Sequence, residues 1–207
     1  MDAKKITIIR HGRTDWNAEG RVQGSIDRPL DEVGMAQAKI LADTFFKLPI
    51  SKIVSSDLER AYHTASIIAK NFPSSVEKHP SLREVRFGAV EGMLWEDFRF
   101  QYKDKIEAYE RLSWDERKKF RYTDTSETYG EVLSRVLPFL QDLCLQSASQ
   151  HILVITHGGV IKALLAEIAG FDDRKVRSQN TGFLTLNFSE GRLLLDHSHG
   201  IDLNLGG

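Results

Sequence analysis

The chain has a single cysteine, Cys144, among its 207 residues. One cysteine cannot form an intramolecular disulfide, and it excludes a metal cage built from several thiolates. Long hydrophobic runs are also absent. The first apolar run, ITII at residues 6–9, is too short for a signal peptide or a membrane span. These absences predict a protein without membrane contact in a reducing compartment, for which we expect a cytoplasmic location.

An excess of charge of one sign is missing too. The 28 Lys and Arg residues nearly balance the 29 Asp and Glu residues, and the net charge is −1. We therefore expect no nucleic-acid partner, because no global positive field is present to attract a phosphate backbone. The sequence also lacks the GxxxxGK phosphate-binding loop and the HExxH zinc motif. Nothing in the composition indicates an oligomeric state.

Short apolar runs alternate with segments of helical periodicity. The runs predict strands at 6–9, 52–56 and 151–159, and a terminal β-hairpin of 183–188 with 192–197. The periodic segments predict helices at 30–48, 127–148 and 160–170, and one ending near residue 72 with Ser56 or Asp57 as its N-cap. This alternation predicts an α/β fold, a three-layer α/β/α sandwich whose mostly parallel sheet contains one antiparallel strand.

One segment interrupts this pattern. Residues 93–126 are rich in aromatic and charged side chains, with helical but irregular periodicity. We interpret them as a small helical cap inserted into a single domain that spans residues 1–207, because no linker or repeat divides the chain.

Two of the predicted strands end in the same way. The sequences IIRHG and VITHGG place His11 and His157 directly after an apolar run and before glycine. The carboxyl ends of parallel strands meet at one edge of a sheet, where ligands bind, so the two histidines should lie together. A lone histidine at a strand end usually caps nearby backbone. Two copies, one of them next to Arg10, predict a functional site.

Arg60 and two glutamates are further candidates. Arg60 lies in the first turn of a helix, where cations are disfavoured, so it indicates either an anionic ligand or a surface ion pair with Asp57 or Glu59. Glu84 and Glu91 flank an apolar stretch. A partly buried carboxyl group could supply a proton to a leaving group, although a glutamate by itself is more often a salt-bridge partner.

Five segments together carry a resemblance that covers nearly the whole chain. RHGRTDWN, VQGSIDRPLDEVG, SSDLERAYHTA, LREVRFGAVEG and ITHGGVI occur in the order found in the histidine phosphatase superfamily, in its phosphoglycerate-mutase-like branch. The resemblance implies that His11 attacks phosphorus and holds the phosphoryl group, while Glu84 protonates the leaving oxygen and later activates water. It further implies phosphate contacts from Arg10, Arg60 and His157, and substrate contacts from Asn17, Thr14, Gln23, Gly24 and Gly158.

Phosphoryl transfer is compatible with this set of residues. Negative charge spreads over three oxygens, which arginine binds in planar, bidentate geometry. The nucleophile must be a neutral imidazole, and we expect Arg10, Arg60 and a charged His157 to keep His11 neutral. Protein cations then take the place of Mg²⁺, so we expect neither a metal nor another cofactor.

Three departures from the family pattern bear on the reaction. Arg13 stands where glutamate is common, the stretch TSET at 125–128 replaces Gly-Gly-Glu-Ser, and the insertion is shorter than in cofactor-dependent phosphoglycerate mutases. A shorter cap lets product leave and water enter. We therefore expect a metal-independent phosphatase acting on a small phosphorylated metabolite.

Two alternatives remain open from the sequence. One is a 2,3-bisphosphoglycerate-dependent phosphoglycerate mutase, in which a basic run would bind a second anionic group unless it is only a solvated face. The other is a catalytically silent phosphate-binding module. The basic run consists of Arg117, Lys118, Lys119 and Arg121.

Overall fold

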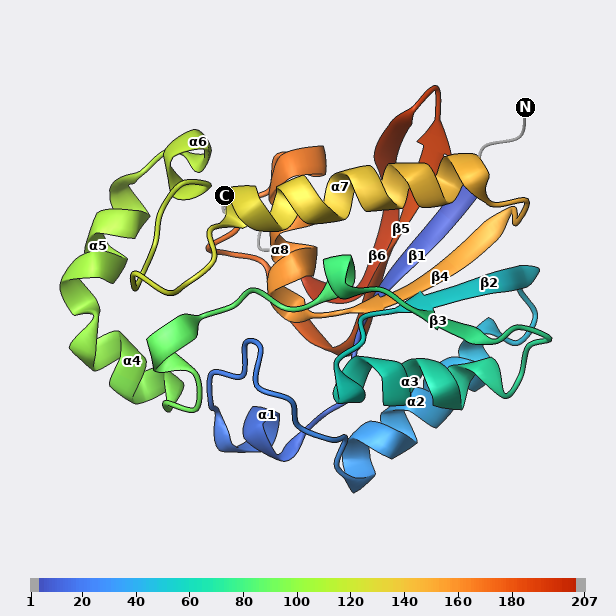
Figure 1. Cartoon of the computed structure of the whole chain (residues 1–207), viewed down its shortest axis with the longest axis horizontal. Helices are drawn as coiled ribbons and strands as arrows, with labels where there is room; N and C mark the ends of the chain where they lie inside the picture. The colour runs from blue at the N-terminus through green and yellow to red at the C-terminus, as the bar shows by residue number, and fades with distance from the viewer. Residues whose placement is uncertain (1–3, 204–207) are drawn as a thin grey trace.

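The computed structural model describes residues 4–203, so residues 1–3 and 204–207 of the predicted domain lie outside it. One six-stranded sheet has the order β3-β2-β4-β1-β5-β6 (Figure 1). The strands are β1 (Lys4–Arg10), β2 (Ile50–Ser55), β3 (Val76–Lys78), β4 (His151–Thr156), β5 (Arg177–Ser189) and β6 (Arg192–Asp202).

Strand direction decides which residues share an edge. The strands β3, β2, β4 and β1 run parallel to one another, whereas β5 pairs antiparallel with both β1 and β6. The predicted mostly parallel sheet with one antiparallel strand is confirmed, and so is the terminal hairpin. In the register, Arg10 faces Thr156 and Ser55 faces Ile155, so the carboxyl ends of β1, β4 and β2 lie side by side.

Helices cover both faces of the sheet, which confirms the three-layer prediction (Figure 1). On one face, α2 (Glu32–Phe45) and α3 (Glu59–Ala69) bury an apolar stripe against the strands. On the other face lie α7 (Tyr129–Gln146) and α8 (Gly158–Ala169), which ends at the left-handed Gly170 as its sequence predicts. The short elements are α1 (Asp15–Glu19), η1 (Pro80–Leu82) and η2 (Gly88–Val90).

The start of α3 differs from the prediction. Its N-cap is Leu58, which makes no side-chain capping bond, and neither Ser56 nor Asp57 occupies that position. The first free amide of the helix, at Glu59, instead donates to the carboxylate oxygens of Asp27 at 2.8 and 2.9 Å. A carboxylate from a distant loop thus replaces the local cap, which local sequence patterns do not predict.

The insertion predicted at 93–126 contains α4 (Trp95–Gln101), α5 (Lys103–Arg111) and α6 (Trp114–Arg117). These helices form the projecting part of the molecule in Figure 1. Their buried apolar side chains belong to a separate small cluster around Phe98, Val90 and Val22. That the whole chain forms one domain stays a prediction. Over residues 4–203, no helix is both long and apolar enough to cross a lipid bilayer.

Candidate active site

His11 and His157 lie together at the carboxyl edge of the sheet. Their ring centroids are 5.1 Å apart, and their exposed fractions are 2% and 0%. The predicted meeting of the two strand ends is therefore confirmed. Ser56, which directly follows β2 and was predicted only as a helix N-cap, also lies at this edge, because its hydroxyl is 2.9 Å from Nε2 of His157.

The His11 ring is fixed by its own backbone. Nδ1 lies 2.7 Å from the carbonyl oxygen of Gly12, so Nδ1–H donates there and leaves Nε2 for chemistry. The His11 carbonyl oxygen accepts from the Asn180 side chain at 3.1 Å and from the Thr181 amide at 3.3 Å. Glycine is required at position 12 because a Cβ there would lie 2.6 Å from the carbonyl oxygen of Gly34.

Both histidines are neutral at neutral pH. Burial and then the charges of Arg60 and Arg10 hold the pKa of His11 well below its ordinary value. Burial and the charge of Arg60 do the same to the pKa of His157. The expectation of a charged His157 is therefore wrong. Removal from water is the largest influence on both rings, and it disfavours the charged form of each.

Arg60 is fully buried, which overturns the alternative of a surface ion pair with Asp57 or Glu59. Its Nη2 donates to the Gly24 carbonyl at 2.8 Å, and its Nη1 donates to the Ile26 carbonyl at 2.9 Å. The guanidinium therefore fixes the loop that follows Gln23. Gly24 adopts a left-handed φ of 56°, which favours glycine.

Unpartnered polar atoms mark this site. Within residues 4–203, four buried side-chain atoms have no hydrogen-bond partner: Nε of Arg10, Nε of Arg60, Nδ1 of His157 and Oε1 of Gln23. All four belong to residues predicted for the site. Buried polar atoms are normally satisfied, so a ligand rich in acceptors fits this arrangement. Rotation of the Gln23 amide by 180° would present its NH₂ group to that ligand.

The carboxylate of Glu84 lies next to the first turn of α8. Its carboxylate accepts from the Gly159 amide at 3.0 Å and from the Val85 amide at 2.9 Å. Arg135 donates to the Glu84 carbonyl at 3.2 Å and forms a bidentate ion pair with Glu127, at 2.8 and 3.0 Å. Glu127 of the TSET stretch therefore anchors the arginine that holds Glu84 in place, although the family's glycines are absent.

Glu91 organises a loop and makes no ion pair among the described residues. Its carboxylate accepts from the amides of Ser25 and Phe87, each at 2.9 Å. A Cβ on Gly24 would lie 2.1 Å from Oε1 of Glu91, so the two positions constrain each other. The salt-bridge interpretation of both glutamates is wrong within residues 4–203.

Thr14 and Asn17 form a capping box at the start of α1. The Thr14 hydroxyl accepts from the Asn17 amide at 3.2 Å, and Oδ1 of Asn17 accepts from the Asn180 side chain at 3.1 Å. Because Asn180 also bonds the His11 carbonyl, Asn17 is connected to the histidine through one residue. Direct ligand contacts of Thr14 and Asn17 stay predictions.

Arg13 and Gly158 have structural contacts that the sequence did not specify. Nε of Arg13 lies 2.7 Å from Oδ2 of Asp31, the N-cap of α2, so its charge is directed at that helix start. Gly158 opens α8, and a Cβ there would lie 3.4 Å from Nε of Arg10. A side chain at position 158 would therefore meet Arg10 at ordinary contact distance, whereas a Cβ on Gly159 would lie 2.5 Å from Oε1 of Glu84.

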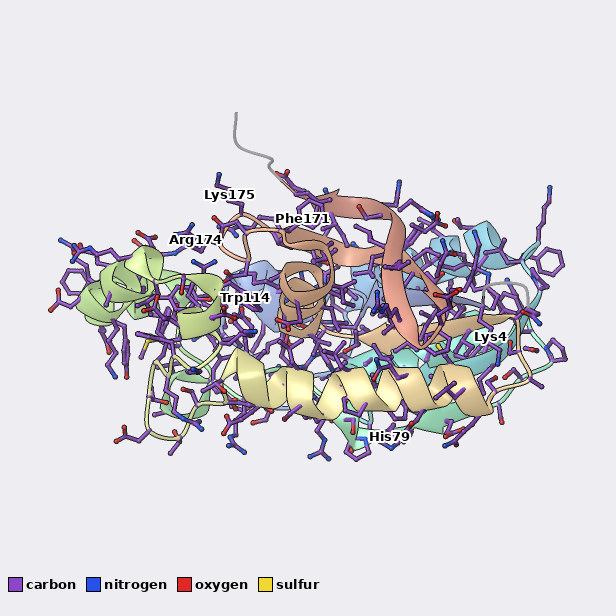
Figure 2. All side chains as sticks on the ribbon, turned by 90° about the horizontal axis from the view of Figure 1, so that it is seen from above. Lys4, His79, Trp114, Phe171, Arg174 and Lys175 are labelled. Atoms are coloured by element: carbon purple, nitrogen blue, oxygen red, sulfur yellow. The ribbon has the colours of Figure 1, made fainter. Side chains whose placement is uncertain are left out.

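Three of the four residues in the basic run of the insertion are engaged in ion pairs. Arg117 is buried with Nε 2.8 Å from Oδ1 of Asp173, and Lys118 lies 3.1 Å from Glu167 of α8. Arg121 bonds Glu131 of α7, and only Lys119 is exposed without such a tie. Trp114, labelled in Figure 2 between α6 and α8, donates to Glu167 at 2.8 Å. These cations join the insertion to the body of the molecule.

Comparison with known proteins agrees with this geometry. The model of the histidine phosphatase superfamily (branch 1) matches residues 6–199. A metal-independent phosphoserine phosphatase of Arabidopsis thaliana is 32% identical over 81% of this chain and 69% of its own length. Phosphoglycerate mutase-like protein 4 of the same plant is 35% identical over 79% of this chain and 70% of its own length.

A solved structure shows the same fold. A mycobacterial glucosyl-3-phosphoglycerate phosphatase, in complex with VO3, superposes with a TM-score of 0.83 at 27% identity, over 94% of this chain and 98% of that chain. The match of family and fold has one consequence. The chain belongs to the histidine phosphatase superfamily (branch 1), and it is a phosphomonoester phosphatase of the histidine phosphatase type.

Proposed function

We propose that this phosphatase hydrolyses a small phosphorylated metabolite without a metal, through a phosphohistidine on His11. One observation carries the proposal. The imidazole of His11 is buried and neutral, and its proton is on Nδ1, so Nε2 has a lone pair for attack. Beside this ring lie unpartnered nitrogen atoms of Arg10, Arg60 and His157. This is a nucleophile next to fixed donors for a phosphate.

In the first step, the lone pair on Nε2 of His11 forms a bond to phosphorus while the bond from phosphorus to the ester oxygen breaks. The ester oxygen keeps that electron pair and takes a proton from the carboxyl group of Glu84. Arg10 and Arg60 offset the charge that spreads over the three remaining oxygens. Nδ1–H of His11 stays bonded to the Gly12 carbonyl, which keeps the ring oriented.

In the second step, water attacks phosphorus and gives its proton to the Glu84 carboxylate. The N–P bond breaks, its electron pair returns to Nε2 of His11, and inorganic phosphate leaves. Glu84 is then protonated again for the next cycle. The amides of Gly159 and Val85 keep its carboxyl group in position during both steps.

His157 acts as a neutral donor. With the Ser56 hydroxyl donating to Nε2, the proton of His157 resides on Nδ1, the atom that has no partner within the described residues. Nδ1–H can then bind a phosphate oxygen without adding a charge. Because no positive charge develops beside it, His11 keeps its neutral form.

Turnover of a chromogenic phosphate ester in the presence of EDTA tests the proposal. We expect hydrolysis by the wild-type protein and none by His11→Ala. Brief incubation with ³²P-labelled substrate should leave acid-labile, alkali-stable label on the protein, as expected for phosphohistidine. Absence of turnover or of this label would overturn the mechanism, and binding without labelling would favour the silent phosphate-binding module.

The mutase alternative has less support. Returning a phosphoryl group requires that the substrate stay bound, and the basic run that was its candidate second site is tied into ion pairs with Asp173, Glu167 and Glu131. A mutase would interconvert 2- and 3-phosphoglycerate in the presence of 2,3-bisphosphoglycerate. We expect free phosphate to be the only phosphorus-containing product.

A further inference from the structure

The strand β5 is irregular where it passes the carboxyl edge of the sheet. Its register with β6 shifts between Ser178 and Phe183, so that residues 179–182 stand opposite the single Gly200. Extra residues of this kind form a bulge, which changes the direction of side chains and is frequent next to active sites. The pairing of β1 with β5 extends as far as Ile9, so the bulge lies directly beyond the last pair, next to the strand end that carries the proposed nucleophile.

Thr181 has an unfavourable backbone conformation in this bulge. Its φ is 61°, in the left-handed region that β-branched residues rarely adopt. Two bonds hold it there: the Thr181 hydroxyl donates to the Asn180 carbonyl at 2.6 Å, and the Thr181 amide donates to the His11 carbonyl at 3.3 Å. Strain of this kind persists only where the surrounding contacts maintain it, and it is concentrated at functional sites.

The bulge and the residue before it contact three residues predicted for the site. The Ser178 carbonyl accepts from Nη1 of Arg10. Nδ2 of the half-buried Asn180 donates to the His11 carbonyl and to Oδ1 of Asn17, both at 3.1 Å. One irregular segment of β5 therefore holds a guanidinium, the backbone of the nucleophile and a side-chain amide.

The peptide group between His11 and Gly12 is held from both sides. Its carbonyl accepts from the Asn180 side chain and from the Thr181 amide, which both belong to the bulge. Its N–H, on Gly12, donates to the Thr64 hydroxyl of α3 at 3.0 Å. Because the Gly12 carbonyl in turn accepts from Nδ1 of His11, the position of this peptide sets where Nε2 of the ring points.

The hydrogen bonds also fix the orientation of two side-chain amides. Asn180 faces a backbone carbonyl, which only accepts, so its NH₂ group and not its oxygen points there. Its second N–H meets Oδ1 of Asn17, and that oxygen is identified independently because it also accepts from the Thr14 amide at 3.2 Å. Nδ2 of Asn17 is then left as a donor without a bond to any of residues 4–203.

We infer that Asn180 is a positioning residue for phosphoryl transfer, which fixes the backbone of His11 and the orientation of the Asn17 amide without touching the reacting atoms. The inference rests on the proposed function, because it assigns what holds the nucleophile of that reaction. A displacement of Nε2 by about 1 Å can lower the rate about 100-fold. Loss of Asn180 should therefore lower kcat more than it weakens phosphate binding.

Two substitutions separate the two parts of this role. Asn180→Ala removes both donors and should lower kcat for p-nitrophenyl phosphate about 10- to 100-fold, with the inhibition constant of inorganic phosphate within about threefold of wild type. Asn180→Asp has the same shape but places a carboxylate against the His11 carbonyl and Oδ1 of Asn17. It should lower kcat at least as much and raise the inhibition constant of phosphate about 10-fold, because the Asn17 amide then turns its NH₂ group towards the new carboxylate.

Asn187 gives a matched control on the same strand. It pairs with Lys5 at the amino end of β1, and its half-buried side chain makes no hydrogen bond within residues 4–203. Asn187→Asp makes the same chemical change and should leave kcat and the inhibition constant of phosphate within about twofold of wild type. Urea unfolding of every variant measures the fraction of folded protein, to which the kinetic constants are referred.

The outcomes distinguish the two proposals. Wild-type kcat in both folded Asn180 variants would overturn the positioning role and leave the phosphatase mechanism intact. The same holds for a kcat that falls only in proportion to the unfolded fraction, which would make Asn180 a structural residue. No turnover of any ester by the wild-type enzyme would refute the proposed function itself.

A measurement on the wild-type protein serves as the test should neither Asn180 variant fold. Both N–H groups of the Asn180 side chain are bonded, so its hydrogen exchange, followed by NMR, should be at least about 10-fold slower than that of the Asn187 side chain. Equally fast exchange of the two side chains would contradict the inference.

Discussion

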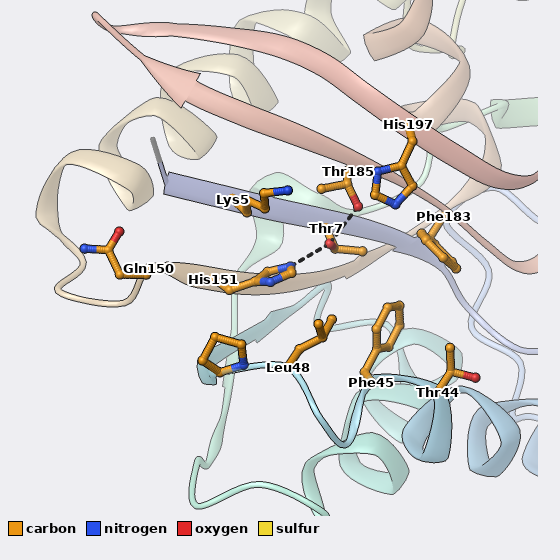
Figure 3. Close-up of a pocket in the computed structure, with 11 residues that line it drawn as sticks. Lys5, Thr7, Thr44, Phe45, Leu48, Gln150, His151, Phe183, Thr185 and His197 are labelled. Atoms are coloured by element: carbon orange, nitrogen blue, oxygen red, sulfur yellow. Dashed lines mark hydrogen bonds between the residues drawn. The ribbon is translucent and has the colours of Figure 1, made fainter. Parts of the chain in front are cut away.

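The strands β1 and β4 carry buried polar residues at both of their ends. At the amino end, Nε2 of His151 lies 2.8 Å from the Thr7 hydroxyl, which lies 3.0 Å from the Thr185 hydroxyl. These side chains line a cavity of about 640 Å³ with apolar walls from Phe45 and Phe183 (Figure 3). At the carboxyl end lie the rings of His11 and His157.

The two ends differ in what their polar atoms bond. Burial lowers the pKa of His151 as it does that of His157, so this shift does not distinguish them. At the amino end the histidine and both hydroxyl groups have partners, which gives a closed network. At the carboxyl end the unpartnered atoms of Arg10, Arg60 and His157 collect instead. A buried histidine is thus not sufficient for a site. Unsatisfied donors and fixed cations are what point to a phosphate.

Replacing the histidine at each end should give the largest difference. His11→Ala removes the nucleophile and should lower kcat by about 10⁴-fold or more. His151→Ala should leave kcat within about threefold of wild type and lower the free energy of unfolding by about 1–3 kcal/mol, because it leaves the Thr7 hydroxyl short of a partner. Steady-state kinetics and urea unfolding measure the two effects. A comparable loss of kcat in His151→Ala would contradict the proposed difference between the two ends of the strands.

Arg60→Lys tests the fixed cations at the carboxyl end. A lysine keeps the charge but cannot bond the carbonyls of Gly24 and Ile26 while also offering a planar donor to phosphate. We expect kcat/KM to fall about 10²- to 10³-fold. Arg13→Lys, at a partly exposed arginine paired with Asp31, is the control and should change kcat/KM by less than about threefold.

The hydroxyl partners of His157 and His151 form a smaller matched pair. Ser56→Ala leaves Nε2 of His157 without its donor, so the proton shifts between ring nitrogens and kcat/KM should fall about 10-fold. Thr7→Val should cost about 1–3 kcal/mol of stability with little change in kcat/KM, because it breaks a structural network. Equal effects on kcat/KM would show that the two hydroxyl groups do not differ in role.

The pH dependence of stability should give the smallest contrast. The pKa values of His11 and His157 lie below their unfolded values near 6.5, so unfolding takes up protons below that pH. The contribution of these two histidines to the free energy of unfolding should therefore have its full value above about pH 6.5. It should decrease as the pH falls towards the folded-state pKa values. Urea midpoints between pH 5 and 8 should show a flatter profile in the double variant His11→Gln, His157→Gln. The flattening should exceed that in His151→Gln, whose pKa is lowered less strongly.

Several features could be read from the sequence because they depend on local pattern and on strand direction. The apolar runs before His11 and His157 specify two parallel strands, and parallel strands present their carboxyl ends at one edge. The glycine that follows His11 in the sequence is required there because a Cβ would lie 2.6 Å from the Gly34 carbonyl oxygen. The start of α3 could not be predicted from the local pattern, because its capping carboxylate, Asp27, comes from a loop more than thirty residues earlier.

The sequence by itself determined the fold class and the family, and it predicted that His11 and His157 meet at the carboxyl edge of the sheet. Only the tertiary structure decided which cations form ion pairs and which histidines are neutral. Arg117 and Lys162 look equally basic in the sequence, yet Arg117 pairs with the carboxylate of Asp173, whereas Lys162 is half-buried and has no ion pair within residues 4–203. His157 is neutral because packing removes it from water beside Arg60. Charge and protonation depend on which groups are brought close and how much water remains, and both are set by contacts between distant segments.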